Sequence, residues 1–496
     1  MASPDPTNWR DAMSRPDKDK WLAAAHDEFK SLLDNGTYEL VNRARTRGMK
    51  ILPCHWVFRL KPDGTYKARL VVKGFMQQYG IYYTEIYAPV VRLETALLNG
   101  TIDCLIYMEQ PPGSLVDPES RRNFVCKLRK SLYGLKQAPH LWYHTFVEFM
   151  LSQGFIRLHK DRRVFVKTSP DGFIIVSLYV DDLLILAPNL ALIESTKASL
   201  SKRFKMKDLG DVRDILGWQV QRDRTNRTVF LHQTRSCEAI LDQFSMSKCA
   251  PVKTPFESSN SPLSAAMCAS TPEEVAAMAN HPYRSAIGSF MYLAMGTRPD
   301  LAYPLQQLSQ FLENPGPKHR SAAKHVFRYL RGSSTHGILL GGPTALSRPF
   351  LSTQITQLLF FGCLISWLAK KQNFVTLSTT EAEFVALALC IQECLYMRQL
   401  ASELQQTSDR PIPVHEDNQS TIKIAETAEH YGHSKHIDVR YMFVRDLIEA
   451  QEFGLKYCPT KQQLADFFTK AHPLMRHFAK PSALLSTSTH HRDGAS

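Results

Sequence analysis

The sequence lacks the features that mark an exported or membrane-bound protein. Its ten cysteines are scattered and contain no C-x-x-C pair, which is typical of reduced thiols in an intracellular compartment. Residues 1–13 are polar, so we expect no signal peptide. The most apolar run, Leu358–Ala369, is too short to cross a bilayer. These absences predict an intracellular protein that does not bind a membrane.

Acidic residues are also scarce. The 496 residues contain 60 Lys and Arg against 47 Asp and Glu, which gives a formal net charge of +13. Because the cations are spread along the chain, this excess predicts a polyanionic partner. Nucleic acid is the leading candidate, and an acidic membrane surface is the alternative. No Asp or Glu occurs between residues 314 and 380.

Two adjacent carboxylates nevertheless stand in an apolar hairpin pattern. Residues 164–186 read as two strands around a Ser-Pro-Asp-Gly turn, followed by a third apolar run, and Asp181 and Asp182 precede that run. Paired acids repel each other and lose hydration on burial, so an apolar hairpin has little reason to carry them without a metal ion. Mg²⁺ prefers carboxylate oxygens, and two such ions clamp the reacting oxygens of a phosphoryl transfer. A turn with two solvated Asp residues is the alternative.

Several ordered motifs carry a family resemblance. Tyr-Val-Asp-Asp at Tyr179–Asp182 resembles the metal-binding turn in the palm of reverse transcriptases. SLYGLKQAPHLWY at 131–143, KARLVVKGF at 67–75 and YAPVVRLET at 87–95 are similar to the polymerase region of copia-type retrotransposon polyproteins. The resemblance covers most of the chain. It implies an RNA-directed DNA polymerase that uses Mg²⁺, or Mn²⁺, with RNA template, DNA primer, RNA–DNA hybrid and dNTPs as partners.

A cation-bearing hairpin is expected at residues 55–75, where two strand patterns flank a Pro-Asp-Gly turn. Such a ribbon suits a triphosphate or a template backbone, and an exposed hairpin with solubilising charge is an equally weighted alternative. By resemblance this is the fingers hairpin. Arg69 is then the first candidate for binding the triphosphate, and Lys67 the second.

A glycine turn follows, before a helix expected from about Ala138 to Gln153. By resemblance this turn lies under the nascent base pair. Gly134 would permit a close backbone approach, while Lys136 and Gln137 would contact nucleotide or template. A plain turn before a core helix is the alternative.

The polymerase resemblance breaks where the first palm aspartate should stand. In the family, a few tens of residues, including a strand with an Asp, separate YAPVVRLET from a Leu-Asn-Gly sequence. In this chain the Arg-Leu-Glu-Thr sequence at 92–95 is followed almost at once by the Leu-Leu-Asn-Gly sequence at 97–100. The nearest acids are Glu94 and Asp103, and neither is expected on a strand that faces Asp181. Since two-metal chemistry needs carboxylates from different strands, this gap argues against polymerase activity.

The last third of the chain resembles the RNase H domain that ends copia-type polyproteins. Ser378 and Glu381 have capping-box spacing at a helix start, which leaves Glu383 as the candidate metal ligand. Asp417 follows an apolar strand, and Asp466 lies on a later expected helix. Singly, each is more often a cap or a surface acid. In family order they resemble three of the four carboxylates that hold two Mg²⁺ for hydrolysis of the RNA strand.

The fourth carboxylate should lie on the first strand of that domain, within the segment that has no acid. Residues 341–361 do not resemble the family, although FGCLISW at 361–367 rejoins it. Either a frame disturbance in a decayed copy or a faulty gene model explains this pattern, and the sequence leaves both open. RNase H activity is therefore in doubt as well.

The sequence thus predicts an α+β multidomain protein: a right-hand polymerase with fingers and palm, a helical connection, and an RNase H-like α/β domain. Function by descent is reverse transcriptase plus RNase H, in a cytoplasmic virus-like particle or the nucleus by resemblance. The competing hypothesis, which we favour for this copy, is a catalytically inactive relic that binds nucleic acid. Oligomeric state stays open. The expected segments are a disordered leader 1–16, fingers and palm 17–230, thumb or connection 231–335, RNase H-like domain 336–472 and disordered tail 473–496.

Overall fold

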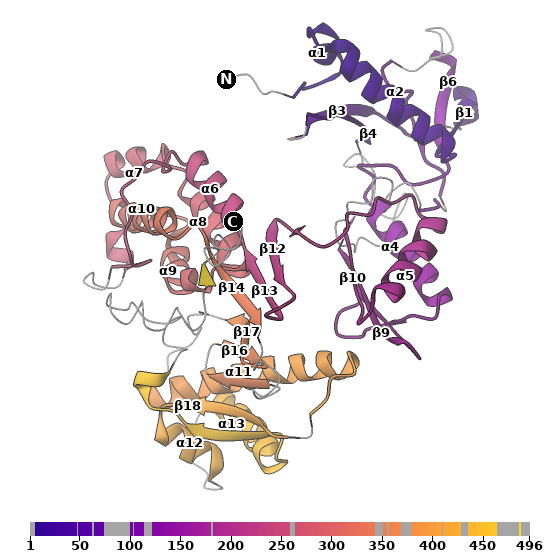
Figure 1. Cartoon of the computed structure of the whole chain (residues 1–496). Coiled ribbons are helices and arrows are strands. Elements are labelled where there is room, and N and C mark those ends of the chain that lie inside the picture. Colours follow the sequence, from indigo (N-terminus) through magenta and orange to yellow (C-terminus); the bar gives the residue numbers. More distant parts are fainter. Residues whose placement is uncertain are drawn as a thin grey trace, which may run out of the picture. The chain divides into compact units, whose positions relative to one another are not determined.

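The chain forms two compact units, Met1–Gly210 and Asp211–Ser496, and each is described by itself (Figure 1). Both units mix helices with sheets, which confirms the mixed α and β character expected from the sequence. The computed structural model describes residues 5–46, 48–61, 64–73, 100–102, 104–113, 122–179, 182–257, 263–342, 351–354, 357–367, 369, 378–408, 410–427, 435–463 and 486–487.

The first unit begins with two helices, α1 (Trp9–Ser14) and α2 (Lys18–Asp34). Helix α1 corrects the expected disordered leader: the Asn8 side chain accepts a hydrogen bond from the Asp11 backbone N–H at 3.0 Å, which caps the helix. Trp9 then packs against Trp56, with 5.7 Å between ring centroids. A local cap and an aromatic contact thus order residues whose composition alone reads as polar.

Helix α2 confirms the expected helix at 17–35 and packs on the expected hairpin, β3 (Cys54–Leu60) with β4 (Tyr66–Val72). Trp21 and Phe29 of α2 are buried at helical spacing. A separate four-stranded sheet lies in the same unit, in the order β1 (Tyr38–Asn42), β6 (Phe124–Leu128), β5 (Tyr107–Met108) and β2 (Ile51–Leu52).

The second part of this unit confirms the expected hairpin at 164–186 and the helix that precedes it. Its antiparallel sheet has the order β10-β9-β8-β7. Side chains from both of its helices and from the sheet form one core, in which Trp142 and Phe146 are fully buried. The elements are α4 (Ala138–Ser152), β7 (Ile156–Arg157), β8 (Val164–Ser169), β9 (Gly172–Tyr179), β10 (Asp182–Leu186) and α5 (Leu190–Arg203).

The second unit opens with a sheet in the order β11-β12-β13-β14-β20, followed in sequence by a helical cluster. Strand β14 (His336–Gly341) pairs antiparallel with β13, so the expected boundary at residue 336 separates two hydrogen-bonded strands. Strand β20 (Ser486–Thr487), in the tail expected to be disordered, pairs with β14. The other elements are β11 (Asp214–Ile215), β12 (Trp218–Asp223), β13 (Thr228–His232), α6 (Thr234–Gln243), α7 (Pro272–Ala279), α8 (Tyr283–Gly296), α9 (Ala302–Leu308) and α10 (Pro317–Gly332).

A charged network lies at the centre of the helical cluster. Arg298 and Asp300 are fully buried and form an ion pair of 2.6 Å. Arg298 also donates to the Ser333 carbonyl oxygen at 2.9 Å, and the Tyr329 hydroxyl donates to Asp300 at 2.8 Å. The Arg298 charge holds the pKa of the Asp300 carboxyl below its usual range, against the opposing effect of burial. Each charge is therefore compensated inside the core.

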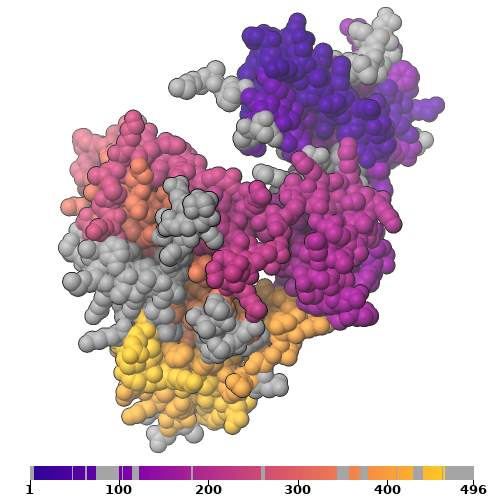
Figure 2. All heavy atoms as spheres, in the orientation of Figure 1, coloured from indigo at the N-terminus to yellow at the C-terminus, as the bar shows by residue number. Residues whose placement is uncertain are grey.

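A mixed sheet ends the second unit, in the order β17-β16-β15-β18-β19. Strands β15, β16 and β17 are antiparallel, whereas β18 runs parallel to both β15 and β19. Figure 2 shows the surface of these elements in orange to yellow. The elements are β15 (Leu351–Gln354), β16 (Gln357–Phe360), β17 (Cys363–Trp367), α11 (Thr379–Glu403), β18 (Ile412–Glu416), α12 (Gln419–Glu426), α13 (Lys435–Glu449) and β19 (Phe453–Tyr457).

Helix α11 is long and apolar enough, by length and composition, to cross a membrane. A core helix passes the same test. Helix α11 contacts β15, β16, α12 and α13, and its Phe384, Leu387 and Ile391 side chains are buried in the core of this sheet. This packing explains its apolar composition without a membrane.

Candidate functional site

The two predicted triphosphate-binding cations lie on β4. Ala68 and Leu70 of this strand are buried, so the period of two places Lys67 and Arg69 on its other face. The Arg69 guanidinium lies over the Tyr133 ring, with 4.9 Å from Cζ to the ring centroid. Strand alternation and this stacking contact therefore hold the Arg69 side chain against the turn before α4.

Glu28 of α2 provides a negative charge beside these cations. Burial raises the pKa of the Glu28 carboxyl to about 6, while a hydrogen bond from the Leu70 backbone and the charges of Arg69 and Lys67 oppose that rise. Glu28 Oε1 and Arg69 Nε are both buried without a hydrogen-bond partner among the described residues. The Arg69 side chain on β4 thus keeps one donor that no described residue satisfies.

Gly134 makes a close backbone contact with β4, while its approach to a nascent base pair stays a prediction. The Val72 backbone N–H donates to the Tyr133 carbonyl oxygen at 2.8 Å. Gly134 has φ +91°, and a Cβ at this position would lie 2.1 Å from the Val72 carbonyl oxygen. Only glycine fits this contact. Gly134 therefore brings the turn against the strand that carries Lys67 and Arg69.

The remaining residues predicted in this turn differ in exposure. Lys136 is half-buried. Gln137 is only 5 % exposed, and its Nε2 donates to the Cys104 sulfur at 3.9 Å. This burial argues against the predicted direct contact of Gln137 with nucleotide or template. Its position immediately before α4 explains the difference, because the start of a core helix draws it inward.

The carboxylate hairpin joins β9 and β10. Tyr179 pairs with Asp182 across the hairpin, and Asp182 is half-buried. Asp181, like the neighbouring acids Glu94 and Asp103, lies outside the described residues. Among the strands that the structure describes, β10 is the edge of its sheet. Strand β9 occupies one side of β10, and no described strand pairs with its other side to present a carboxylate to this hairpin.

A second group of carboxylates lies in the mixed sheet of the second unit. The Ser378 hydroxyl caps α11 by accepting from the Glu381 backbone N–H at 3.1 Å, as the spacing predicts, and Glu383 follows two residues later. One carboxylate oxygen from each of Glu383, Glu416 and Asp417 lies within 4.8 Å of the others. The structure thus brings Glu383 and Asp417 together. Asp466 lies outside the described residues.

Sequence reasoning missed Glu416. The alternation of Ile412, Val414 and Glu416 on β18 gives all three side chains to the buried face of the strand, and this period was the available signal. Burial raises the pKa of the Glu416 carboxyl to about 8, and the charges of Glu383 and Asp417 add to the rise. Its Oε1 accepts from the Asn418 backbone N–H at 2.9 Å.

This group fits a hard divalent cation. All of its donors are carboxylate oxygens, the ligands that Mg²⁺ and Mn²⁺ prefer. Glu383 Oε2 and Glu416 Oε2 are buried and have no hydrogen-bond partner within the described ranges. Two buried oxygens that lack partners in an acidic cluster require a proton or a cation.

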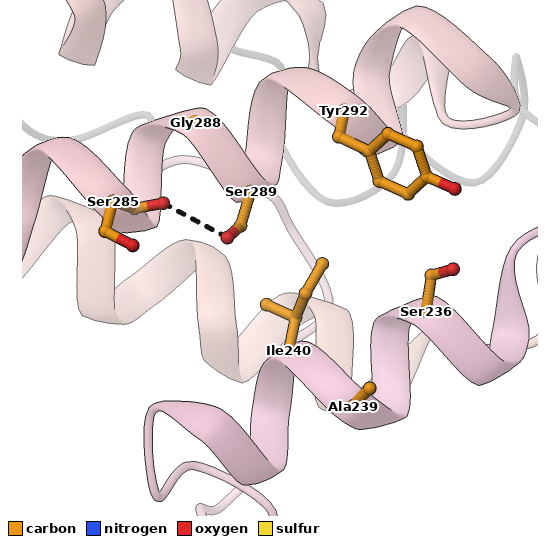
Figure 3. A pocket seen from close by; sticks show the side chains of 7 residues that line it. All are labelled: Ser236, Ala239, Ile240, Ser285, Gly288, Ser289 and Tyr292. Atoms are coloured by element: carbon orange, nitrogen blue, oxygen red, sulfur yellow. Dashed lines mark hydrogen bonds between the residues drawn. The ribbon is translucent and has the colours of Figure 1, made fainter. Parts of the chain in front are cut away.

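A groove between α6 and α8 lies apart from this chemistry. It is lined by Ser236, Ala239, Ile240, Ser285, Gly288, Ser289 and Tyr292 (Figure 3). The Ser289 hydroxyl donates to the Ser285 carbonyl oxygen at 3.1 Å within α8, and Tyr292 donates to the Leu216 carbonyl oxygen at 3.3 Å. This lining holds no carboxylate, so it does not offer the acids that a two-metal site needs.

Comparisons with known proteins show the family to which this chain belongs. Residues 35–258 match the family described as "Reverse transcriptase (RNA-dependent DNA polymerase)". The Pol polyprotein from transposon TNT 1-94 of Nicotiana tabacum is 38% identical, covering 95% of this chain and 38% of that protein. The Pol polyprotein from transposon RE1 of Arabidopsis thaliana is 32% identical, covering 94% of this chain and 34% of that protein. The chain therefore spans less than two-fifths of these relatives.

A shorter relative matches over nearly its whole length. The putative transposon Ty5-1 protein of Saccharomyces cerevisiae is 30% identical, covering 61% of this chain and 99% of that protein. Among solved structures, a foamy viral protease–reverse transcriptase in complex with double-stranded DNA aligns with a TM-score of 0.46 and 13% identity, over 88% of this chain and 69% of that one. On the sequence matches, the chain belongs to the family of copia-type retrotransposon Pol polyproteins and contains their reverse transcriptase domain.

Proposed function

We propose that this chain is the reverse transcriptase and RNase H region of a copia-type element by descent, in a copy that binds template and primer but no longer transfers nucleotides. The observation that carries the proposal is the position of β10, the strand that follows the Asp181–Asp182 pair. It is the edge of its sheet within the part of the chain that the structure describes.

Two-metal phosphoryl transfer needs acids on neighbouring strands, because one turn cannot fix both ions at the required separation. The Asp181–Asp182 turn supplies one set. The strand that should supply the other is missing from the sequence between residues 92 and 100. The position of β10 at the edge of its sheet, among the strands that the structure describes, agrees with this loss. Mg²⁺, or Mn²⁺ in its place, would stabilise the charge on the transferring phosphoryl group, and this copy lacks one of the acids to hold it.

Binding of nucleic acid does not need the missing strand. Lys67 and Arg69 share one face of β4, and Gly134 holds the 131–137 turn beside them. Lys136 lies in the same turn. Cations placed on a rigid hairpin suit a triphosphate or a phosphate backbone, and the net charge of +13 favours the same partner. We therefore assign dNTP and template-primer binding to this surface.

The second carboxylate group supports an RNase H-like role for the last domain. Glu383 and Asp417 would hold Mg²⁺ there, with Asp466 as the third expected acid. Carboxylate oxygens of Glu383 and Asp417 lie within 4.8 Å of each other, which supports a shared cation at this position.

Fluorescence anisotropy of a labelled RNA–DNA hybrid, measured on the full chain in EDTA at several salt concentrations, tests the binding claim. We expect tight, salt-sensitive binding, and a Lys67→Gln, Arg69→Gln double variant whose log–log salt slope is flatter by roughly one to two. A Lys18→Gln, Lys30→Gln variant removes the same charge from exposed positions on α2 and is the control. Equal effects of the two double variants, or no binding at low salt, would contradict the proposal.

A further inference from the structure

We propose that Glu416 binds a divalent cation together with Glu383 and Asp417, and so supplies an acid that the family resemblance does not assign to this site. The proposal deepens the RNase H-like role proposed above and rests on it for its biological meaning. The cation site itself stands on the geometry of the three side chains.

Glu416 occupies a position that an apolar residue would normally fill. It is fully buried at the end of β18 and shares the inner face of this strand with Ile412 and Val414. An ionised carboxylate at such a position loses its hydration, and in the absence of a compensating partner this loss is costly. A structural reason must therefore exist for keeping the acid there.

A backbone hydrogen bond accounts for only one of the two oxygens of the Glu416 carboxylate. Glu416 Oε1 accepts from the Asn418 backbone N–H at 2.9 Å, whereas Oε2 has no partner among the described residues. Helix α12 does not need Glu416 as a cap, because the Asn418 side chain accepts from the Ser420 backbone N–H at 2.8 Å. The second oxygen is therefore available for a ligand.

The surroundings of the Glu416 carboxylate are acidic. Oxygens of Glu383, Glu416 and Asp417 lie within 4.8 Å of one another, and Glu383 Oε2 is also buried without a partner. None of the three forms an ion pair with a Lys, Arg or His in the described ranges. A cation between them removes the repulsion and satisfies both oxygens. Since the donors are all oxygens, Mg²⁺ and Mn²⁺ fit better than Zn²⁺, which favours nitrogen and sulfur ligands.

The proposal also bears on the segment from residue 314 to residue 380, which contains no Asp or Glu. Strand β15 runs parallel to β18 and pairs with it at Thr353 and Gln354, neither of which is acidic. By resemblance, the first strand should supply a carboxylate to the site. Glu416 enters the group from β18 instead. Three carboxylates in this space fit one ion, so we assign a single cation to the site.

Mn²⁺ binding to the full chain, followed by electron paramagnetic resonance of the free ion in the absence of nucleic acid, tests the assignment. The background carries Asp181→Asn and Asp182→Asn, so that the hairpin pair does not contribute. We expect one bound ion, which Mg²⁺ displaces. Glu416→Gln keeps an acceptor for Asn418 and should weaken binding by roughly tenfold or more, as the loss of a direct ligand exceeds the loss of an outer partner. Glu426→Gln, at an exposed position on α12, should leave binding unchanged.

Thermal unfolding provides the second readout. Without metal, the Glu416→Gln protein should be at least as stable as its parent, because a buried acid has been removed, and Mn²⁺ should no longer raise its Tm. Equal Mn²⁺ affinity in the Glu416→Gln and parent proteins, or no binding by the parent at millimolar Mn²⁺, would overturn the assignment. Hybrid binding in EDTA does not depend on this site, so failure here is distinct from failure of the proposed function.

Discussion

Replacing Gly134 by alanine should be far more damaging than replacing another glycine that has a similar backbone. Gly134 and Gly36 both have positive φ, +91° and +59°, in the first unit. A Cβ on Gly36 meets nothing within 4 Å, whereas a Cβ on Gly134 meets the Val72 carbonyl oxygen at 2.1 Å and Val71 Cγ1 at 2.7 Å. Comparing the two alanine variants therefore distinguishes the effect of backbone strain from the effect of a steric clash.

The expected magnitudes follow from these surroundings. Gly36→Ala introduces only left-handed strain, about 1 to 2 kcal/mol. Gly134→Ala adds overpacking against a backbone atom that cannot rotate away, about 1 to 3 kcal/mol. The turn must then move, which also weakens the 2.8 Å bond from the Val72 N–H to the Tyr133 carbonyl oxygen. We expect a total loss of about 2 to 5 kcal/mol in Gly134→Ala.

Urea unfolding of the full chain, together with hydrogen exchange of the β4 amides, measures this difference. Exchange at residues 66–72 should accelerate in Gly134→Ala and stay near the parental rate in Gly36→Ala. Hybrid affinity should fall only in the Gly134 variant, because Tyr133 would no longer lie under Arg69. Equal stability losses in the two variants would refute the close contact between the turn and β4.

Three further perturbations follow from buried and edge positions. Asp300→Asn leaves the Arg298 charge unpaired in the core and should lower the free energy of urea unfolding by about 3 to 5 kcal/mol. Asp211→Asn is the control, since its partner Arg224 is exposed, and should lower that free energy by under about 1 kcal/mol. Equal losses in the two variants would contradict the buried network. The Glu28 pKa is raised from 4.5 to about 6, so its protonated form stabilises the folded protein. This contribution to the unfolding free energy is fully present below pH 4.5 and is lost as pH rises through 6. Glu28→Gln should therefore remove a fall of up to about 2 kcal/mol in unfolding free energy across that window, while Asp27→Asn should preserve it, and a slope that survives Glu28→Gln would count against this reading. Strand β10 is apolar, half-buried and at the edge of its sheet within the described residues, so we expect sedimentation velocity to show self-association through this edge. Leu184→Lys should reduce that association and Leu151→Lys on α4 should not, and association that is equal in both variants would contradict the role of β10.

Much of this architecture was predictable because its signals are local. The Trp21 and Phe29 spacing predicts α2, the two Asp-Gly turns predict the hairpins at β3–β4 and β8–β9, and Ser378 predicts the start of α11. Each of these signals lies within one element. The prediction that residues 1–16 are disordered was wrong because its signal was only local. Helix α1 is held by the contact of Trp9 with Trp56, which lies far along the chain.

The site was predictable in part. Glu383 and Asp417 come together as expected, yet Glu416 was missed because a capping or metal role was sought at the end of the strand rather than on its inner face. The motif predicted that Gln137 contacts nucleotide or template, but the side chain is buried. Burial depends on tertiary packing, which a sequence motif does not report. The edge position of β10 among the described strands likewise depends on pairing between segments, which a local sequence signal does not report.

Primer extension on an RNA template is the most direct test of the central claim, that the polymerase fold persists without its chemistry. The full chain is incubated with an annealed DNA primer, dNTPs and Mg²⁺ or Mn²⁺, beside an Asp181→Asn, Asp182→Asn control, and hybrid binding is verified in the same samples. We expect bound hybrid and no extension above the control with either metal. Extension that the double substitution abolishes would contradict this claim, and would mean that another acid, such as Glu94 or Asp103, completes the site.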